Sequence, residues 1–399
     1  MREGHRVQPR LASSETARRI NRETLWELIR HHQPVSRAGL ARLSGLQRST
    51  VSAIIEQLTA EGWVREGALK ALPRGRHPVM IGVNQSMACI AIDLHPQFFV
   101  AGAVDLTGSL LCRVTQSLHR DPKLALQTVI EHTKALIRSL PEHNFQGIGV
   151  SLPGRVDAAT QRLIFAPNLK WPEYDIKAHL EKSLGMQAEM ENAANTCLRS
   201  ELWWGGLRGV RNAVVVAVSE GVGTGILANG QLLRGERGMA GEFGHITLNP
   251  EGPRCRCGRR GCWEMYGSSR AALRYLAEES PDEKRTTYEE LLRLAGEGET
   301  HALASLRRQA ECIGRGLAMI GAALAPEVFL LAGDFTSAWK QVGAVVEKEY
   351  ASHLLSGAKA ARLQVIQGGD VARLRGAAAM IFERCSSAAQ ATRGGANQQ

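Results

Sequence analysis

A short segment past the middle of the chain brings one imidazole and three thiols close together. It runs Gly241-Glu-Phe-Gly-His245 and continues as Cys255-Arg-Cys257-Gly-Arg-Arg-Gly-Cys262-Trp-Glu264. One histidine with three cysteines is a common ligand set of the closed, tetrahedral zinc sites that stabilise a fold. Gly258 and Gly261 allow the backbone to turn between the second and third thiols. We therefore predict a structural zinc ion, with the ligands His245, Cys255, Cys257 and Cys262.

Two other interpretations of this segment stay open. The loop would then be a simple structural staple, or two thiols would form a disulfide and leave the third one free. Zinc is favoured because a CxCx4C run is rare by chance and the other five of the eight cysteines are scattered, as in reduced proteins. Glu242 and Glu264 flank the motif without being needed as ligands, which predicts a neighbouring pocket that binds hydroxyl groups.

The composition bounds the class of protein. The chain has 399 residues, of which 44% are hydrophobic, enough for two or three domains with their own cores. Nothing near the N-terminus resembles a signal peptide, and the apolar runs have the length of strands rather than of membrane-spanning helices. We therefore expect a cytoplasmic protein without a membrane partner.

The positive charge of the chain is concentrated at its N-terminal end. Residues 1–80 carry 14 Arg or Lys against 7 Glu and no Asp, which accounts for +7 of the total net charge of +10. An asymmetry of this kind indicates an anionic partner such as DNA. A solvated basic tail would have the same charge, so the pattern of hydrophobic residues must distinguish such a tail from a folded domain that binds an anionic partner.

Three short helices are predicted in this basic region. The first has one apolar face and ends at Pro34. A second, over residues 37–43, is capped by Ser36 and stops at Gly45, and a third covers about 47–61. Two helices joined by a short turn with glycine form the helix-turn-helix unit. The residues predicted to face its core are Ile20, Leu25, Leu28 and Ile29 in the first helix and Val51, Ile54, Ile55 and Leu58 in the third.

The segment that follows extends this unit to a winged helix-turn-helix. Residues 63–66 are predicted to form a strand, and residues 67–78 a basic hairpin rich in glycine and proline. The third helix would meet base edges in the major groove, while the wing would reach phosphates or the minor groove. The alternative is a three-helix module that binds protein. The candidate DNA contacts are Gln47, Arg48, Ser49, Ser52, Arg74 and Arg76.

After Pro78 the pattern changes to strands that alternate with helices. Several predicted strands end in short polar or glycine-rich segments, the place where α/β folds bind their ligands. No sequence repeat is evident. The predicted strands lie at residues 88–94, 98–105, 147–150, 188–190, 213–218 and 328–332, and the clearest helix at 124–140.

With these features the chain resembles the ROK family, which groups sugar-responsive transcriptional repressors with sugar kinases. The resemblance runs nearly end to end, and the zinc motif is its most specific part. It implies a pair of actin-like, ribonuclease-H-like α/β lobes that close on a sugar, preceded in the repressor branch by a winged helix-turn-helix. It also implies that the sugar pocket is lined by Gly154, Asn168, Asn192, Glu242, His245 and Glu264.

The chain departs from the kinases of this family at the positions that matter for phosphoryl transfer. The residue after the pocket asparagine is Ala193 instead of the aspartate base, and a methyl group accepts no proton. After Asp93 the phosphate loop Gly-Gly-Thr is replaced by a segment containing Pro96, which has no N–H. A second glycine pair becomes Gly333-Asp334, while Gly223-Thr224-Gly225 is either a remaining phosphate loop or a hinge. We therefore predict no enzymatic activity.

These observations predict a zinc-containing repressor that binds operator DNA and responds to a sugar or sugar phosphate. Twofold half-sites on DNA predict a homodimer or homotetramer. A slow sugar kinase with a DNA-binding appendage and a repressor released by a protein partner are the alternatives. The predicted domains are a DNA-binding domain at 1–82, a first lobe at 83–196 joined by a C-terminal helix at about 366–385, a second lobe at 197–365 and a disordered tail at 386–399.

Overall fold

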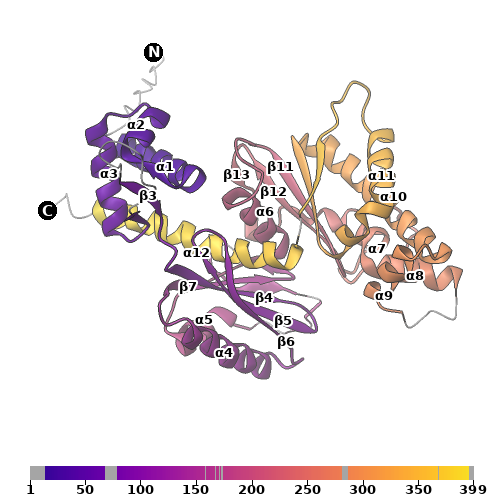
Figure 1. The fold of residues 1–399 in the computed structure, drawn as a ribbon. Helices are drawn as coiled ribbons and strands as arrows, with labels where there is room; N and C mark the ends of the chain where they lie inside the picture. Colours follow the sequence, from indigo (N-terminus) through magenta and orange to yellow (C-terminus); the bar gives the residue numbers. More distant parts are fainter. Residues whose placement is uncertain are drawn as a thin grey trace, which may run out of the picture.

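The computed structural model describes residues 14–67, 79–157, 159–166, 168–169, 171, 174–280, 286–366 and 368–394. Figure 1 shows a small helical domain at the N-terminal end and two α/β lobes, with a long C-terminal helix running between them. In the described part of the chain, no helix is both long and apolar enough to cross a membrane.

The N-terminal domain has the three predicted helices, α1 (Ser14–His32), α2 (Arg37–Ser44) and α3 (Arg48–Ala60). Ser36 caps α2, since its hydroxyl oxygen accepts a hydrogen bond from the Gly39 N–H at 3.1 Å. The helix ends at Gly45, whose φ of 72° is the left-handed conformation that favours glycine. Short helices with these local caps are specified by adjacent residues, which is why the sequence predicted them.

A three-stranded antiparallel sheet completes this domain. Its order is β1 (Val35–Ser36), β3 (Met80–Val83) and β2 (Val64–Gly67). The strand predicted at 63–66 corresponds to β2, but β1 and β3 were not predicted. The hairpin that would carry Arg74 and Arg76 lies outside the described residues.

One core prediction for α1 is wrong. Ile20 is 49% exposed instead of facing the core. The neighbouring residues 17–19 are exposed as well, so the first turns of α1 project beyond the helices that cover the rest of it. Leu25 and Ile29, one and two turns further along, are fully buried as predicted.

The first lobe is built on a five-stranded sheet in which β4 is the middle strand. It pairs antiparallel with β5 and parallel with β7, so that the sheet is mixed. The helices α4 (Pro122–Ser139) and α5 (Ile176–Leu184) belong to this lobe, and a small ribbon, β8 (Arg155–Val156) with β9 (Leu163–Phe165), follows β7. The strand order is β10 (Ala188–Asn192), β7 (Asn144–Leu152), β4 (Met87–Leu94), β5 (Phe98–Asp105) and β6 (Leu110–Ser117).

The second lobe repeats this topology. Its middle strand β11 pairs antiparallel with β12 and parallel with β14, as β4 does with β5 and β7. The strand order is β13 (Gln231–Leu232), β12 (Val222–Ala228), β11 (Ala213–Val218), β14 (Val328–Ala332) and β15 (Arg362–Val365). Its helices are α7 (Glu264–Gly267), α8 (Ser269–Glu279), α9 (Tyr288–Gly296), α10 (Thr300–Leu324) and α11 (Trp339–Ser352), with short 3-10 turns η1 (Glu236–Gly238), η2 (Glu242–His245) and η4 (Asp334–Ala338).

Two helices hold the lobes together, α6 (Ala193–Trp203) and α12 (Gly369–Gly394). They touch backbone to backbone, because a Cβ added at Gly376 would lie 1.7 Å from the Thr196 carbonyl oxygen. Gly149 of β7 allows α12 to approach in the same way. Helix α12 continues to Gly394, so it overlaps the start of the disordered tail predicted from Ser386.

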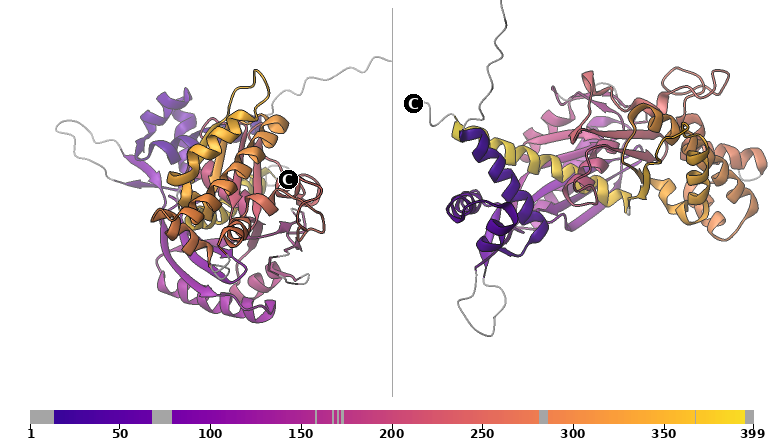
Figure 2. Two further views of the ribbon diagram at one scale, coloured as in Figure 1. Left: turned by 90° about the vertical axis from the view of Figure 1, so that its right-hand side faces the viewer. Right: turned by 90° about the horizontal axis from the view of Figure 1, so that it is seen from above.

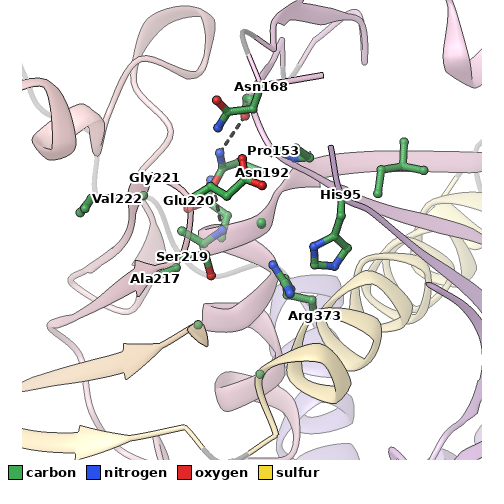
Figure 3. Close-up of a pocket in the computed structure, with 18 of the residues that line it drawn as sticks. His95, Pro153, Asn168, Asn192, Ala217, Ser219, Glu220, Gly221, Val222 and Arg373 are labelled. Atoms are coloured by element: carbon green, nitrogen blue, oxygen red, sulfur yellow. Dashed lines mark hydrogen bonds between the residues drawn. The ribbon is translucent and has the colours of Figure 1, made fainter. Parts of the chain in front are cut away.

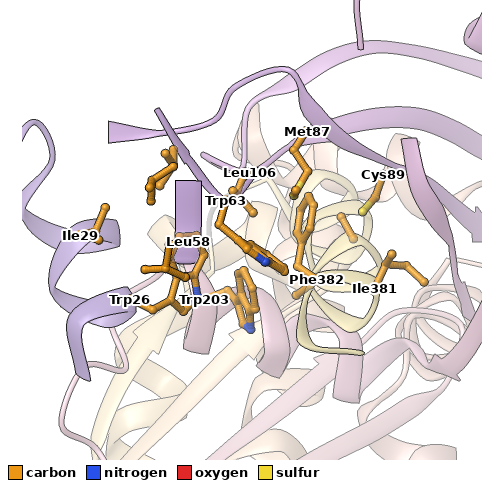
Figure 4. Packing of buried hydrophobic residues seen from close by; sticks show 14 of the residues in the cluster. Trp26, Ile29, Leu58, Trp63, Met87, Cys89, Leu106, Trp203, Ile381 and Phe382 are labelled. Atoms are coloured by element: carbon orange, nitrogen blue, oxygen red, sulfur yellow. The ribbon is translucent and has the colours of Figure 1, made fainter. Parts of the chain in front are cut away.

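The N-terminal domain packs against the far end of α12 through one continuous apolar cluster. Trp26 and Trp63 meet edge to face at 5.2 Å between ring centroids, and Trp203 stacks on Phe382 at 5.7 Å. All four belong to one hydrophobic core that also contains residues of the first sheet (Figure 4). The right-hand view of Figure 2 shows the N-terminal helices beside the end of α12. The DNA-binding domain is therefore joined to the lobes by buried contacts rather than by a linker alone.

Candidate functional site

A cavity of about 730 Å³ lies between the two lobes. On one side its walls are the ends of β4, β7 and β10. On the other side they are β12, η2 and the loop that carries Cys255, Cys257 and Cys262, here called the zinc-motif loop. Figure 3 shows Asn168 and Asn192 toward one end and His95 with Arg373 toward the other. All six residues predicted for the sugar pocket line this cavity, namely Gly154, Asn168, Asn192, Glu242, His245 and Glu264.

The four predicted metal ligands meet at one point beside the cavity. Their ligand atoms lie within 4.8 Å of one another. The Sγ atoms of Cys257 and Cys262 are 3.5 Å apart, and Cys255 Sγ is 3.6 Å from His245 Nδ1. Zn–S bonds of about 2.3 Å in a tetrahedron require S···S edges of about 3.8 Å. The spacing therefore fits a small tetrahedral ion.

No disulfide joins the thiols of this cluster. All eight cysteines are free thiols. Burial raises the pKa of Cys255 and raises that of Cys262 to about 12, so without a metal these groups stay protonated at neutral pH. A bound cation would displace the protons, as metal binding to thiols requires. Gly261 is necessary for the turn, because its φ is +62° and a Cβ would lie 1.5 Å from the Asn249 carbonyl oxygen.

The two flanking carboxylates occupy different environments. Glu264 is 8% exposed, and its oxygens accept from Arg270 Nη2 at 3.1 Å and from the Val222 N–H at 3.2 Å. Glu242 faces His245, whose Nε2 lies 3.7 Å from Glu242 Oε2. Burial raises the pKa of Glu242, while His245 acts in the opposite direction. The imidazole thus presents Nδ1 to the thiols and Nε2 to the cavity side.

Asn192 both lines the cavity and caps a helix. Its Oδ1 accepts from the Ala194 N–H at 2.8 Å, and its Nδ2 donates to the Gly154 carbonyl oxygen at 2.7 Å. Gly154 has a φ of +138°, and a Cβ there would lie 2.4 Å from the Phe165 carbonyl oxygen. These bonds fix the carboxamide at the start of α6, with Ala193 as the first helical residue.

Several residues that line the cavity were not predicted. Arg256, between two of the metal ligands, donates to Asn168 Oδ1 at 2.7 Å and so links the zinc-motif loop to the first lobe. Arg155 directly follows Gly154, lies 5.3 Å from the centroid of the Phe165 ring and donates to the Met239 sulfur. Both arginines adjoin motif residues, a signal that the sequence offered. The other missed residues include Glu191, Arg234, His95 and Arg373.

The end of β4 and the turn after it contain a buried ion cluster. Asp93 is fully buried, and its Oδ2 lies 2.9 Å from Arg373 Nε and 2.7 Å from His95 Nε2. The turn between β4 and β5 stacks His95 on Phe98 at 4.0 Å. Burial alone would raise the pKa of Asp93, but Arg373 and His95 together bring it below its ordinary value. This carboxylate is therefore ionised and ties α12 to β4.

Of two predicted glycine-rich loops, one differs in the structure. Gly223-Thr224-Gly225 lies within strand β12 and not in a loop. A Cβ at Gly225 would lie 2.8 Å from the Ala194 carbonyl oxygen, so this glycine lets β12 pack against α6. Gly333-Asp334 does follow a strand and lines the cavity, where Gly333 has a φ of +88°.

The predicted DNA contacts of α3 lie on its free side. Gln47, Arg48 and Ser49 are exposed at the N-terminal end of the helix, and Ser52 is half-buried one turn later. The opposite face carries Val51, Ile54, Ile55 and Leu58, all buried. The described part of the domain therefore presents polar residues at the helix end that a recognition helix uses.

Comparison with known proteins agrees with this architecture. The model of the ROK family matches residues 89–384, and that of the IclR helix-turn-helix domain matches residues 27–67. Over 350 residues the chain is 29% identical to the xylose repressor of Bacillus subtilis (strain 168), covering 87% of this chain and 90% of the repressor. It is also 32% identical over 317 residues to a glucokinase of Streptomyces coelicolor, covering 74% of this chain and 97% of the kinase.

Solved structures give the same fold. A ROK family transcriptional regulator described as a homologue of the E. coli MLC protein superposes with a TM-score of 0.76 at 20% identity, covering 93% of this chain and 99% of the other. A ROK family glucokinase from Streptomyces griseus, in complex with glucose and AMPPNP, has a TM-score of 0.66 at 27% identity and covers 74% and 99%. The regulator matches nearly the whole chain, whereas the glucokinase matches about three quarters of it. The chain therefore belongs to the ROK family, in the branch that carries a helix-turn-helix domain before the two actin-like, ribonuclease-H-like lobes.

Proposed function

We propose that this protein is a transcriptional repressor that binds operator DNA and loses affinity for it when a sugar or sugar phosphate enters the interlobe cavity. The observation that carries the proposal is that one chain joins a helix-turn-helix domain to lobes whose cavity gathers all six predicted sugar residues. The similarity to a xylose repressor makes D-xylose the first candidate effector, and the similarity to glucokinases makes D-glucose the second.

We also propose that the Cys3His cluster holds a structural zinc ion. The zinc would bind His245 and the three cysteines and cross-link η2 to the loop that leads into α7. This cross-link would fix Glu242 and Glu264, one residue from each of the two elements, on the wall of the cavity. Zinc would thus act on the sugar indirectly, by holding the groups that bind it.

The proposed mechanism is a linkage between lobe closure and DNA binding. A sugar that contacts both lobes favours one closure state, and it shifts the equilibrium only if it binds the two states differently. In a symmetric homo-oligomer, that shift changes the spacing of two α3 helices and weakens binding to paired half-sites. Both the oligomer and its symmetry are part of the proposal.

A slow sugar kinase is the competing function, favoured by the 32% identity to a glucokinase. Two features support the repressor instead. Ala193 occupies the position of the general base, whose loss lowers rates by about 10²- to 10⁴-fold. His95, in the segment after Asp93 where the resemblance places a glycine-rich phosphate loop in the kinases, pairs with the Asp93 carboxylate, as Arg373 does. We expect no transfer of phosphate from ATP to either sugar.

Thermal unfolding of the zinc-loaded protein tests the sugar site. D-xylose, D-glucose, amino sugars and their phosphates are compared, with and without ATP. A sugar at about 100 times its dissociation constant adds about 2.7 kcal/mol to the stability, or about 5–10 °C for a lobe of this size. We expect a selective shift that does not need ATP. Glu264→Gln should weaken binding by about 10- to 100-fold, because bonds to a charged group are lost, whereas the exposed Glu278→Gln should not.

If no sugar shifts the midpoint of the folded protein, the sugar proposal is wrong. A repressor released by a protein partner would then be the better hypothesis, with the cavity serving only as scaffold. A shift that appears only with ATP, together with the release of ADP, would favour the kinase.

Arg48→Ala tests the DNA interface. The guanidinium is exposed at the start of α3, where it would contact a base or a phosphate. The loss of such a contact costs about 1–3 kcal/mol, so operator binding should weaken by about 5- to 150-fold while sugar binding stays unchanged. The measurement is a titration of a duplex selected from a random pool. Arg138→Ala, an exposed helical arginine of the first lobe, is the matched control, and equal affinity of both variants would exclude Arg48 from the interface.

A further inference from the structure

Besides the apolar cluster, one buried arginine of the N-terminal domain contacts the lobes. The side chain of Arg30, on α1, is 6% exposed. Its guanidinium lies 4.1 Å from the centroid of the Trp203 ring and also donates to the Trp203 carbonyl oxygen. Within its own domain it pairs with Glu27 at 2.6 Å. One side chain thus joins α1 to the last residue of α6.

Helix α6 runs from this joint to the sugar cavity. It is capped by Asn192, which lines the cavity, and it ends at Trp203. Its 11 residues span about 16 Å at 1.5 Å per residue. A displacement of Asn192 or of its neighbours by a bound sugar therefore moves the indole that Arg30 contacts, because a packed helix shifts as a unit.

A series of ion pairs, buried at Glu191 and Arg199 and half-exposed at its two ends, runs alongside this helix. It begins at Glu191, which lines the cavity and lies 3.1 Å from Arg234 Nε of the second lobe. Glu191 Oε2 is 3.8 Å from Arg199 Nη2 in the middle of α6, and both side chains are at most 10% exposed. Arg199 in turn pairs with Glu383 of α12. Burial lowers the pKa of Arg199 to about 10, and the attraction of Glu191 opposes that effect.

The chain ends at the same indole. Glu383 Oε1 accepts the Trp203 Nε1–H at 2.9 Å, so Trp203 touches Glu383 with its ring nitrogen and Arg30 with its ring face and carbonyl group. The contacts are thus continuous from the second lobe, through α6 and α12, to the DNA-binding domain. Each charged side chain pairs with one of opposite charge. Where a pair is buried, the loss of one partner is costly, so this series of ion pairs favours discrete arrangements.

We propose that α6 and the chain Glu191–Arg199–Glu383 transmit the state of the sugar cavity to the DNA-binding domain, with Arg30 and Trp203 as the connecting contact. This inference rests on the proposed function, since it names the route by which sugar would change operator affinity. Arg234 connects the second lobe to Glu191, so that lobe closure displaces Glu191, the first residue of this series of ion pairs. Arg30 does not line the cavity, so it acts through Trp203 and is a positioning residue.

The first test measures how strongly sugar and operator are coupled in Arg30→Met. Methionine keeps an apolar side chain of similar length but removes the guanidinium. The readout is the ratio of operator dissociation constants with and without D-xylose or D-glucose, for which couplings of about 5- to 150-fold are usual. We expect this ratio to fall to near one in Arg30→Met and to stay at the wild-type value in Arg293→Met, which removes an exposed arginine of α9. An unchanged ratio in Arg30→Met would overturn the proposal.

The second test needs no sugar. Glu191→Gln and Arg30→Met are combined in a double-mutant cycle on binding of the selected duplex. When two mutated sites are distant and independent, their effects on an equilibrium constant multiply to within about twofold. We expect Glu191→Gln to change operator affinity in the wild-type background and to have no effect in the Arg30→Met background. Multiplicative effects, or no effect of Glu191→Gln alone, would contradict a shared chain.

The two tests separate the failure of this inference from the failure of the proposed function. If neither sugar changes operator binding by the wild type while the cycle is non-additive, sugar sensing is wrong and the route through the ion pairs is supported. If sugar changes operator binding equally in the wild type and in Arg30→Met, sugar sensing is supported and the route through the ion pairs is wrong. Thermal unfolding confirms that each variant is folded, and Arg30→Lys, which keeps the charge but not the planar fork, replaces Arg30→Met if that variant is unfolded.

Discussion

Cys257→Ser is expected to release the zinc ion and to lower the free energy of unfolding of the second lobe by more than about 4 kcal/mol, the range typical of a lost metal site. The reason lies in where the ligands are placed. They join η2 to the turn before α7, and the zinc-motif loop itself has isolated bridges between Thr247 and Cys262 and between Arg254 and Arg260 in place of a sheet. At about 2–4 °C per kcal/mol, the unfolding midpoint should fall by about 8 °C or more.

Metal analysis and thermal unfolding together check this prediction. We expect one zinc per chain in the wild type and in Cys112→Ser, a control that removes a half-buried thiol outside the cluster. Cys257→Ser should contain none. A chelator should bring the wild type to the midpoint of Cys257→Ser, because both remove the same bonds. Wild-type protein without zinc after careful preparation, or equal midpoints for both serine variants, would show that the cluster is no zinc site.

The features that the sequence predicted well are those specified over short distances. The metal ligands lie between residues 245 and 262, so one loop can bring them together, and their residue types define the chemistry. Ser36 and Gly45 mark the ends of α2 because capping depends on the immediate neighbours. Local chemistry of this kind needs no knowledge of the fold.

The prediction of a sugar pocket depended on resemblance rather than on local pattern. Gly154, Asn192 and Glu242 lie on three different elements, and nothing in their spacing indicates a common cavity. Their hydrogen bonds also serve the fold, as the capping of α6 by Asn192 shows. A sequence alone cannot separate these two uses, because the same amide satisfies a helix end and faces a ligand.

The missed features depend on long-range packing. Arg373 reaches Asp93 from α12, and Arg234 reaches Glu191 from the other lobe, so no local spacing links either pair. The shared topology of the lobes left no sequence repeat, since many apolar sequences fill the same strand positions. Ile20 fits the helical period of α1, but a period cannot indicate where neighbouring helices stop covering it.

Asp93→Asn is the variant for which we expect the second large effect, a loss of about 3 kcal/mol of stability. Removing one partner of a buried pair costs about 3–5 kcal/mol, and the lower end applies because 16% of the Arg373 side chain is exposed. The measurement is denaturant unfolding of both proteins. Arg373→Met added to Asp93→Asn should recover much of the loss, because the guanidinium that lost its carboxylate is then gone. A stability equal to that of the wild type would mean that the pair does not anchor α12.

The pH dependence of the stability difference between the wild type and Asp93→Asn identifies the cause of that difference. The pKa of Asp93 is lowered by Arg373 and His95 against the effect of burial, so the folded protein holds the carboxylate ionised more firmly than the unfolded chain does. A group with a depressed folded pKa stabilises the protein above its unfolded value, about 3.9, and that contribution disappears as the pH falls through the folded value. The difference between wild type and Asp93→Asn should therefore stay constant from pH 7 to about pH 5 and shrink only below about pH 4. A difference that already shrinks between pH 7 and pH 5 would mean that another group, titrating near neutrality, carries the effect. In that case Asp93 would not be the charge that holds α12 on the first sheet, and its pairing with Arg373 would need another role.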